Sequence, residues 1–198
     1  NEGFEVLAAL VERRGGLPFD RYLRENVFGP AGMGGVGAGV PDSLAAVGYG
    51  RRADDPFGIE PREGFEARVA GRTAGGAGGH FATARDFLRF ARALHDGGLI
   101  RPETLDSLLV VGFDMGEMPW GTQRYARGFT TAEEDGKPIF GHAGGGMHWG
   151  ICGRMDTRRD GSWTVVVLSN YDPPVCEVLG RRIQAVLAAL PEPPAGGE

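Results

Sequence analysis

Lysine is nearly missing from this sequence, which contains a single one, Lys137, among 198 residues. Cysteine is scarce as well, and two residues are too few for a disulfide-rich scaffold or a zinc cluster. No apolar run reaches the roughly 18 residues that cross a bilayer. The formal net charge of -5 offers no basic surface for nucleic acid. We therefore expect no nucleic-acid partner, no membrane segment in this chain, and no metal or other cofactor.

Glycine and proline are abundant instead, with 35 and 13 residues, about twice their usual combined share. Such a composition can indicate disorder, but disordered chains are also poor in apolar residues and strongly charged. Here 41% of the residues are hydrophobic and only 24% are charged. We therefore expect a folded chain, of a length that suits one domain or two small ones.

The first 120 residues are expected to be mostly helical. Asn1 is a suitable N-cap for a helix that ends at Gly15-Gly16, and a second helix is predicted from Pro18 to Gly29. Residues 48–68 look irregular. A capping box at residues 83–86 opens a third helix, and a fourth begins at Pro102. The apolar residues predicted to face inward from these helices are Phe4, Leu7, Ala8, Val11, Phe19, Tyr22, Leu23, Val27, Phe87, Leu88, Ala91, Leu94, Leu105, Leu108 and Leu109.

Residues 121–190 are expected to form an antiparallel sheet and a covering helix. Strands are predicted at 125–131, from Ile139 into a glycine run at 141–146, at 149–155 and at 163–169. Asp135-Gly136 and Asp160-Gly161 are typical of hairpin turns. The final helix carries an apolar stripe that we expect to be buried, comprising Val175, Val178, Leu179, Ile183, Val186, Leu187 and Leu190. The fold class is therefore α+β, with residues 191–198 as a disordered tail.

The glycine-rich run at residues 70–79 leads into a helix, which raises the possibility of a phosphate-binding loop. It lacks the Gly-Lys-Ser/Thr ending of a P-loop and the spacing of a dinucleotide-binding loop. The alternative is a tight loop whose glycines let backbone pack closely against backbone, and we favour it.

Several histidines and a cysteine offer other interpretations. His142, His148 and Cys152 could bind a metal, but their spacing fits no zinc pattern. His95 lies at a helix C-terminus, where it is expected to interact with the helix dipole. Cys152 shares a strand face with Arg154, and one arginine is a weak reason to expect a reactive thiolate. Both cysteines are readily explained as small buried residues, whose redox state stays open.

Three separated segments, taken together, resemble one family. They are residues 1–4 with 28–33, residues 77–83 with Asp86, and the glycine run 141–146 followed by two apolar strands that end at Asn170. In order and spacing they resemble the β-lactamase and penicillin-binding-protein superfamily of serine hydrolases. The similarity is greatest to the class C-like branch, which includes DD-peptidases, D-aminopeptidases and esterases.

This resemblance implies three active-site motifs: Ser-x-x-Lys, Tyr-x-Asn, and Lys/His-Thr/Ala-Gly on a strand. No serine here has a lysine three residues later. Asn1 matches the last residue of the second motif, whose tyrosine would lie two positions before it. The third motif matches His142-Ala143-Gly144, with histidine where many members carry lysine.

The resemblance also implies roles. Acyl transfer needs donors for the developing oxyanion, and the Gly145 N–H would be one of them. His142 would orient the substrate or assist proton transfer, and Asn1 would bond the substrate amide or the catalytic lysine. Ala143, Gly144 and Gly146 would line the substrate. Without the family pattern, the glycines are a strand-edge bulge and His142 a turn residue.

We therefore expect the C-terminal portion of a serine hydrolase that forms an acyl-enzyme on an amide, lactam or ester. Its partners would be a small-molecule or peptide substrate and a missing N-terminal segment of the same protein, without which the portion should be inactive. The alternative is a non-catalytic relative that binds peptide or cell-wall fragments. The substrate, the oligomeric state and the compartment stay open, although members of the family are often extracytoplasmic.

Overall fold

The fold is described from a computed structural model. It describes residues 1–37, 46–55, 57–62, 74–110, 112–118, 121–134, 136–146 and 148–190. The predicted tail at 191–198, Asp135 of a predicted turn and the first part of the glycine run 70–79 lie outside these ranges.

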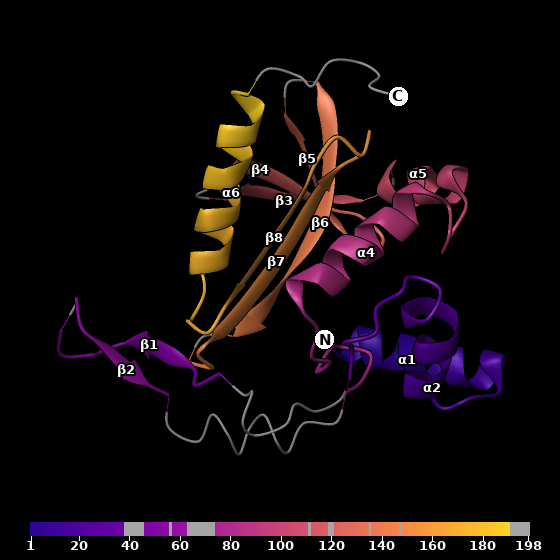
Figure 1. The fold of residues 1–198 in the computed structure, drawn as a ribbon, viewed down its shortest axis with the longest axis horizontal. Coiled ribbons are helices and arrows are strands. Elements are labelled where there is room, and N and C mark those ends of the chain that lie inside the picture. The colour runs from indigo at the N-terminus through magenta and orange to yellow at the C-terminus, as the bar shows by residue number, and fades with distance from the viewer. Residues whose placement is uncertain are drawn as a thin grey trace.

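A six-stranded sheet forms the centre of the molecule (Figure 1). Every strand pairs antiparallel with the next one along the chain, so β3 and β8 are its two edges. Glycines with positive φ, Gly136 and Gly161, lie in the tight turns on either side of the β6–β7 pair. The strands are β3 (Phe113–Met118), β4 (Gly121–Tyr125), β5 (Thr130–Glu134), β6 (Lys137–Gly146), β7 (Ile151–Arg158) and β8 (Thr164–Ser169).

Helices cover both faces of this sheet. Figure 1 shows α6 on one face and α4 with α5 on the other, while α1 and α2 form a pair beyond one end of α4. The helices are α1 (Glu2–Gly15), α2 (Phe19–Leu23) with a π-helical turn at Arg24–Phe28, α4 (Ala84–His95), α5 (Pro102–Val110) and α6 (Val175–Ala188). The α+β class and the antiparallel sheet predicted from the sequence are confirmed.

One strand prediction is wrong in the first half of the sheet, and two strands there were not predicted. The strand predicted at 125–131 is interrupted: Tyr125 ends β4 and Thr130 begins β5. Residues 126–129 form the turn between them, in which Gly128 adopts a φ of 86° and the Ala126 N–H donates to the Phe129 carbonyl at 2.7 Å. Residues 113–118 and 121–123, for which the sequence analysis predicted no strand, supply β3 and most of β4. The pattern of apolar and polar residues over 125–131 did not indicate that the chain reverses there.

Residues 48–68 also contain structure that the sequence pattern did not indicate. Strands β1 (Tyr49–Arg51) and β2 (Ile59–Pro61) form a two-stranded antiparallel hairpin. In Figure 1 this hairpin lies beyond the lower end of α6, and the Tyr49 N–H joins it to the chain just after β8 by donating to the Asn170 carbonyl at 2.8 Å. Three-residue strands are too short for any period-2 pattern to be recognised, which explains the omission.

The apolar core lies between the main sheet and the α4–α5 face. Leu94, Leu105 and Phe140 are almost fully buried and form one cluster. The predicted inward face of α4 is confirmed at Ala91 and Leu94, whereas Leu88 is 38% exposed.

The predicted capping box of α4 is present. The Thr83 hydroxyl accepts from the Asp86 N–H at 3.2 Å, and the Asp86 carboxylate accepts from the Thr83 N–H at 3.0 Å. Asp86 is buried and also accepts from the Gly35 N–H at 3.3 Å. The cap therefore joins the helix start to the loop that follows α2.

The prediction for the buried side of α6 is wrong. The residues that α6 buries are Cys176, Gly180 and Gln184, and the helix contacts β7 and β8. The stripe that was expected to face inward is substantially exposed: Val178 42%, Leu179 42%, Ile183 41%, Val186 62% and Leu190 55%. Small and polar residues face the sheet because they meet polar or disulfide-bonded partners on β7, which an apolar stripe could not satisfy.

Candidate active site

The glycine-rich end of β6 is an open strand edge. Strand β5 pairs with β6 only as far as Gly141, whereas β7 continues to Gly146. The Thr130 hydroxyl donates to the Gly141 carbonyl at 3.1 Å, so the backbone of Gly141 points toward β5. Backbone groups alternate sides along an antiparallel strand. Ala143 and Gly145 therefore direct theirs to the open side, where a ligand could pair with them.

Gly145 is required at its position by both conformation and packing. Its φ is 140°, and a β-carbon there would lie 2.7 Å from the Ile151 carbonyl oxygen and 3.0 Å from Cys152 Cα. Gly144, by contrast, would meet no heavy atom within 4 Å. Glycine at position 145 therefore allows β6 to pair closely with β7, while the Gly145 N–H stays accessible.

His142 lies on the same strand and has an exposed side chain. Its Nε2 atom is 3.4 Å from the Tyr125 hydroxyl, and the two rings meet edge to face with centroids 5.9 Å apart. Burial raises the pKa of Tyr125, so its phenol stays neutral near pH 7. Sequence reasoning missed Tyr125 as a site residue, because the turn that brings it beside His142 was predicted as continuous strand.

A buried carboxylate fixes the turn that follows the glycine run. Asp172 accepts from the Gly150 N–H at 2.7 Å and from Arg62 Nε at 3.0 Å. Arg62 follows β2, and Gly150 directly precedes β7. This network attaches the β1–β2 hairpin to the sheet end that carries Gly145.

Asn1 takes the N-cap position of α1 as predicted, without a side-chain capping bond. Within the described ranges, no hydrogen bond joins Asn1 to His142 or Gly145. The structure therefore brings Ala143, Gly144, Gly145 and Gly146 together with His142 but leaves Asn1 without a direct link to them.

The described part of the glycine run 70–79 packs tightly against α1. The Glu5 carboxylate accepts from the N–H groups of Gly76 and Ala77 at 3.2 and 3.0 Å. A β-carbon on Gly76 would overlap the Phe4 carbonyl oxygen. A carboxylate thus occupies the amides that a phosphate would need, and the tight-loop interpretation is confirmed for residues 74–79.

Cys152 and Cys176 form a disulfide that the sequence analysis did not predict. Their Cα atoms lie 6.0 Å apart, and both residues are buried. With Cys152 in this bond, neither a thiolate nucleophile nor a cysteine metal ligand is available beside His142. Across the described residues, no group of three His, Cys, Asp or Glu side chains could hold a metal ion.

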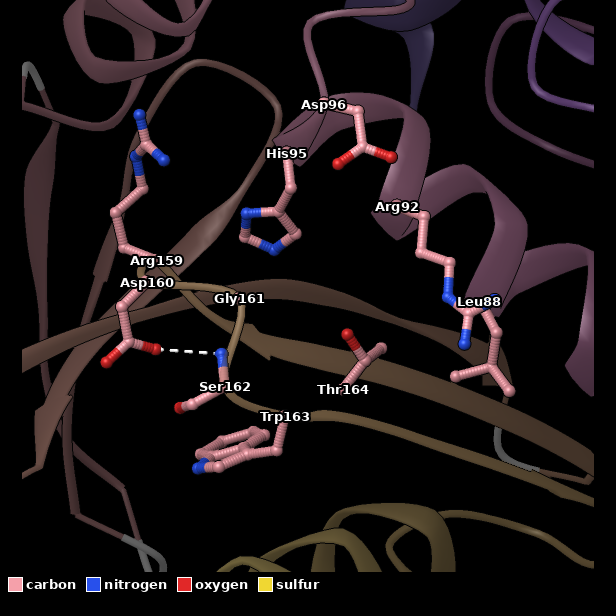
Figure 2. Close-up of a pocket in the computed structure, with 10 residues that line it drawn as sticks. All are labelled: Leu88, Arg92, His95, Asp96, Arg159, Asp160, Gly161, Ser162, Trp163 and Thr164. Atoms are coloured by element: carbon pink, nitrogen blue, oxygen red, sulfur yellow. Dashed lines mark hydrogen bonds between the residues drawn. The ribbon is translucent and has the colours of Figure 1, made fainter. Parts of the chain in front are cut away.

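A cavity of about 580 Å³ lies at the other end of β7, between α4 and the β7–β8 turn (Figure 2). Thr164 of the cavity pairs with Thr157, which lies five residue steps, about 17 Å, along β7 from Cys152, the register partner of Gly145. Charges of both signs line the cavity, from Arg92, Asp96, Arg159 and Asp160. Figure 2 shows Arg159 pointing away from the cavity, and its Nε donates to Asp106 at 2.6 Å. The cavity is not part of the candidate active site.

His95 lines this cavity and has a structural contact there. Its Nε2 atom is 2.9 Å from the Thr157 hydroxyl, which itself donates to the Trp163 carbonyl at 3.1 Å. The same hydroxyl lies 2.7 Å from the Thr164 hydroxyl, so this contact also connects His95 to β8. Burial, with the nearby Arg159 charge, lowers the pKa of His95. His95 thus holds α4 to β7 as a neutral imidazole.

The sequence profile of one family, described as beta-lactamase, matches residues 1–190. The chain belongs to the beta-lactamase family. No curated protein matches it. Its beta-lactamase fold is similar to that of the octameric penicillin-binding protein homologue from Pyrococcus abyssi, with a TM-score of 0.76 at 17% identity. It is also similar to the penicillin-binding protein from Bacillus halodurans, with a TM-score of 0.72 at 25% identity. For the D-amino acid amidase from Ochrobactrum anthropi SV3 the TM-score is 0.69 at 19% identity.

These matches cover nearly all of this beta-lactamase-family chain but only part of each relative. The three structures match over 94%, 93% and 94% of the chain and over 41%, 54% and 57% of their own lengths, respectively. Among the helices that the structure describes, none is long and apolar enough to span a membrane.

Proposed function

We propose that this chain is the C-terminal portion of a serine hydrolase of the class C-like branch, which acts through an acyl-enzyme on an amide, lactam or ester. The observation that carries the proposal is the open edge of β6 with the Gly145 N–H directed toward it. An exposed backbone edge can pair with an extended substrate and present an amide to the carbonyl under attack.

The geometry of β6 supports the roles that we propose for its residues. The Gly145 N–H donates to the developing oxyanion, and the backbone of Ala143 pairs with the substrate beside it. Gly144 and Gly146 keep this face free of side chains. His142, in the place where many class C-like members carry lysine, orients the substrate or transfers a proton, with Tyr125 beside its Nε2 atom. Asn1 serves the same site as the last residue of the second motif.

The nucleophile must come from outside this sequence, in which no serine is followed three residues later by lysine. We propose that a preceding segment of the same polypeptide supplies it. Two surfaces support this assignment. Among the described residues, the outer edge of β8 over Thr164–Ser169 has no partner strand, although Tyr49 bridges to Tyr171 just after it. The α6 stripe, defined as Leu179, Ile183 and Val186 of α6 with Leu190 just beyond its end, is exposed. Exposed edges and apolar stripes of this kind are normally covered.

The absence of Ser-x-x-Lys from this sequence also keeps a second candidate function open. A non-catalytic relative could use the same β6 edge to bind peptide or cell-wall fragments without forming a covalent bond.

Labelling of the full-length protein with a fluorescent penicillin and a fluorophosphonate separates the two functions. The hydrolase forms a covalent adduct whose mass identifies the acylated serine, and hydrolysis rates for matched amide, lactam and ester substrates define its class. A full-length protein that binds peptide but never forms an adduct supports the binding function and contradicts the hydrolase.

A further inference from the structure

Three matched contacts join α6 to β7. At the first, Cys176 forms the disulfide with Cys152. At the second, Gly180 lies against Arg154, where a β-carbon would be 3.2 Å from Arg154 Cδ. At the third, Gln184 Nε2 donates to Asp156 Oδ2 at 2.6 Å. All six residues are buried.

The spacing of these contacts follows from the two secondary structures. The helix residues are four apart, which corresponds to a rise of about 6.0 Å. The strand residues are two apart and share one face, at about 6.8 Å. Because the two repeats nearly coincide, α6 and β7 stay aligned over three contacts, and this explains why α6 buries small and polar residues on this side.

The second and third contacts share a polar cluster between α6 and β7. Arg154 Nη2 donates to Asp156 Oδ1 at 2.9 Å, and Gln184 adds its bond to the other oxygen of the same carboxylate. Both charged side chains are buried, so loss of either partner would strand a charge. The Gln184–Asp156 bond and the Gly180–Arg154 contact would therefore still join α6 to β7 if the disulfide were cleaved.

The first contact lies beside the proposed oxyanion donor, on the neighbouring strand. Cys152 is the register partner of Gly145, and a β-carbon on Gly145 would lie 3.2 Å from Cys152 Cβ. One register pair later, at Gly146 and Ile151, the pairing of β6 and β7 ends. Hairpin ends fray when few contacts hold them. The disulfide is the covalent attachment of this sheet end to a helix.

We propose that the Cys152–Cys176 disulfide positions the Gly145 N–H for the acyl transfer proposed above, an inference that rests on that function. Cleavage of the bond leaves α6 attached through the other two contacts and leaves the turn held by Asp172, but it removes the covalent support beside Gly145. A dithiol reductant breaks the S–S bond with two electrons and two protons, which leaves two thiols, and is itself oxidised to a cyclic disulfide. The site is therefore sensitive to reduction while the fold persists.

The test is the C152A/C176A variant of the full-length protein. We expect kcat to fall about 10- to 100-fold with little change in KM, because a displaced donor affects mainly the transition state. The amides of Gly144 and Gly146, which face β7, should exchange their hydrogens at least about tenfold faster. Exchange is read independently of turnover.

Gln184→Ala is the matched control, since it removes the contact farthest from Gly145. It should lower the Tm but leave kcat and the exchange of both glycine amides within about twofold of wild type. If the disulfide had only a structural role, C152A/C176A would behave like Gln184→Ala, with a lower Tm but unchanged kcat and unchanged exchange of the glycine amides. That result would overturn the proposal.

Two further outcomes are distinguishable. If the glycine amides exchange faster but even the wild-type protein forms no acyl adduct, the disulfide orders this end of β6 but the proposed hydrolase function fails, and its role in acyl transfer fails with it. If C152A/C176A does not fold, the wild type is reduced with dithiothreitol and its kcat is followed against the disulfide fraction measured by mass spectrometry. Activity that stays constant as the disulfide disappears overturns the proposal.

Discussion

At the scale of single residues, adjacent glycines in β6 have different reasons to be glycine. Gly145 has a positive φ and lies against the backbone of β7, so any side chain would force the strands apart. Gly144 has open space where its side chain would be. Glycine at 144 is therefore needed only to keep the face clear, whereas glycine at 145 is needed for the strand pairing itself.

This difference predicts that alanine destabilises the protein much more at position 145 than at position 144. Gly145→Ala should destabilise the full-length protein by about 1–3 kcal/mol because of the strained φ and the close approach to Cys152. It should also reduce kcat/KM about 10²- to 10³-fold through the displaced donor. Gly144→Ala is the matched control and should change stability by less than about 1 kcal/mol. Urea unfolding and steady-state kinetics measure both, and equal destabilisation by the two would contradict this account.

At the scale of elements, the Asp86 carboxylate at the start of α4 accepts hydrogen bonds both from its neighbour Thr83 and from Gly35, which is distant in the sequence. Burial by itself would raise the pKa of Asp86, but hydrogen bonds from the Thr83 hydroxyl, the Thr83 N–H and the Gly35 N–H outweigh it and lower that pKa. A carboxyl group with a lowered pKa in the folded state stabilises the fold in its ionised form.

Asp86→Asn should therefore cost about 1–3 kcal/mol of stability at pH 7. The unfolded pKa of aspartate is about 4. The contribution of Asp86 is complete above that pH and is lost as pH falls below it, so the difference between wild type and variant should shrink toward pH 3. Urea unfolding of the full-length protein across this range measures it. Glu103→Gln, at an exposed first-turn position of α5, is the control and should cost less than about 0.5 kcal/mol.

At the scale of the whole molecule, the two faces of the sheet are built differently. The α4–α5 face holds the apolar core around Leu94, Leu105 and Phe140. On the other face, a disulfide and a buried polar cluster hold α6 to the sheet. The apolar α6 stripe does not pack against the sheet and is exposed. Apolar area of this kind stabilises a fold only when something covers it.

The proposed preceding segment predicts that the α6 stripe is buried in the full-length protein. Ile183→Glu should then lower its stability by about 3 kcal/mol or more, because a charge would lose its hydration. Ala185→Glu, two residues on and about 160° around the same helix, is the control and should change stability by less than about 1 kcal/mol. Thermal and urea unfolding measure both variants. If Ile183→Glu proves as mild as its control, the stripe faces solvent and the covering segment lies elsewhere.

Much of the architecture was predictable from local pattern. Helices over residues 2–15 and 102–110, the capping box at Thr83 and Asp86, and the hairpin turn at Asp160-Gly161 all depend on neighbours within a few positions. The strand predicted at 125–131 failed because Gly128 reverses the chain inside an otherwise strand-like sequence. Period and composition alone do not separate those two cases.

The sequence by itself determined the chemistry available at the candidate site: a glycine run after His142, and no serine-lysine pair to act as nucleophile. The tertiary structure alone decided which of those groups can meet. Strand register places Tyr125 beside His142 and pairs Cys152 with Gly145. It also ends the pairing of β5 with β6 at Gly141, so the rest of the glycine run is open on that side. It also joins Cys152 to Cys176, 24 residues along the chain, and turns the apolar stripe of α6 away from the sheet. Register and helix rotation are set by contacts between distant segments, which local sequence patterns do not encode.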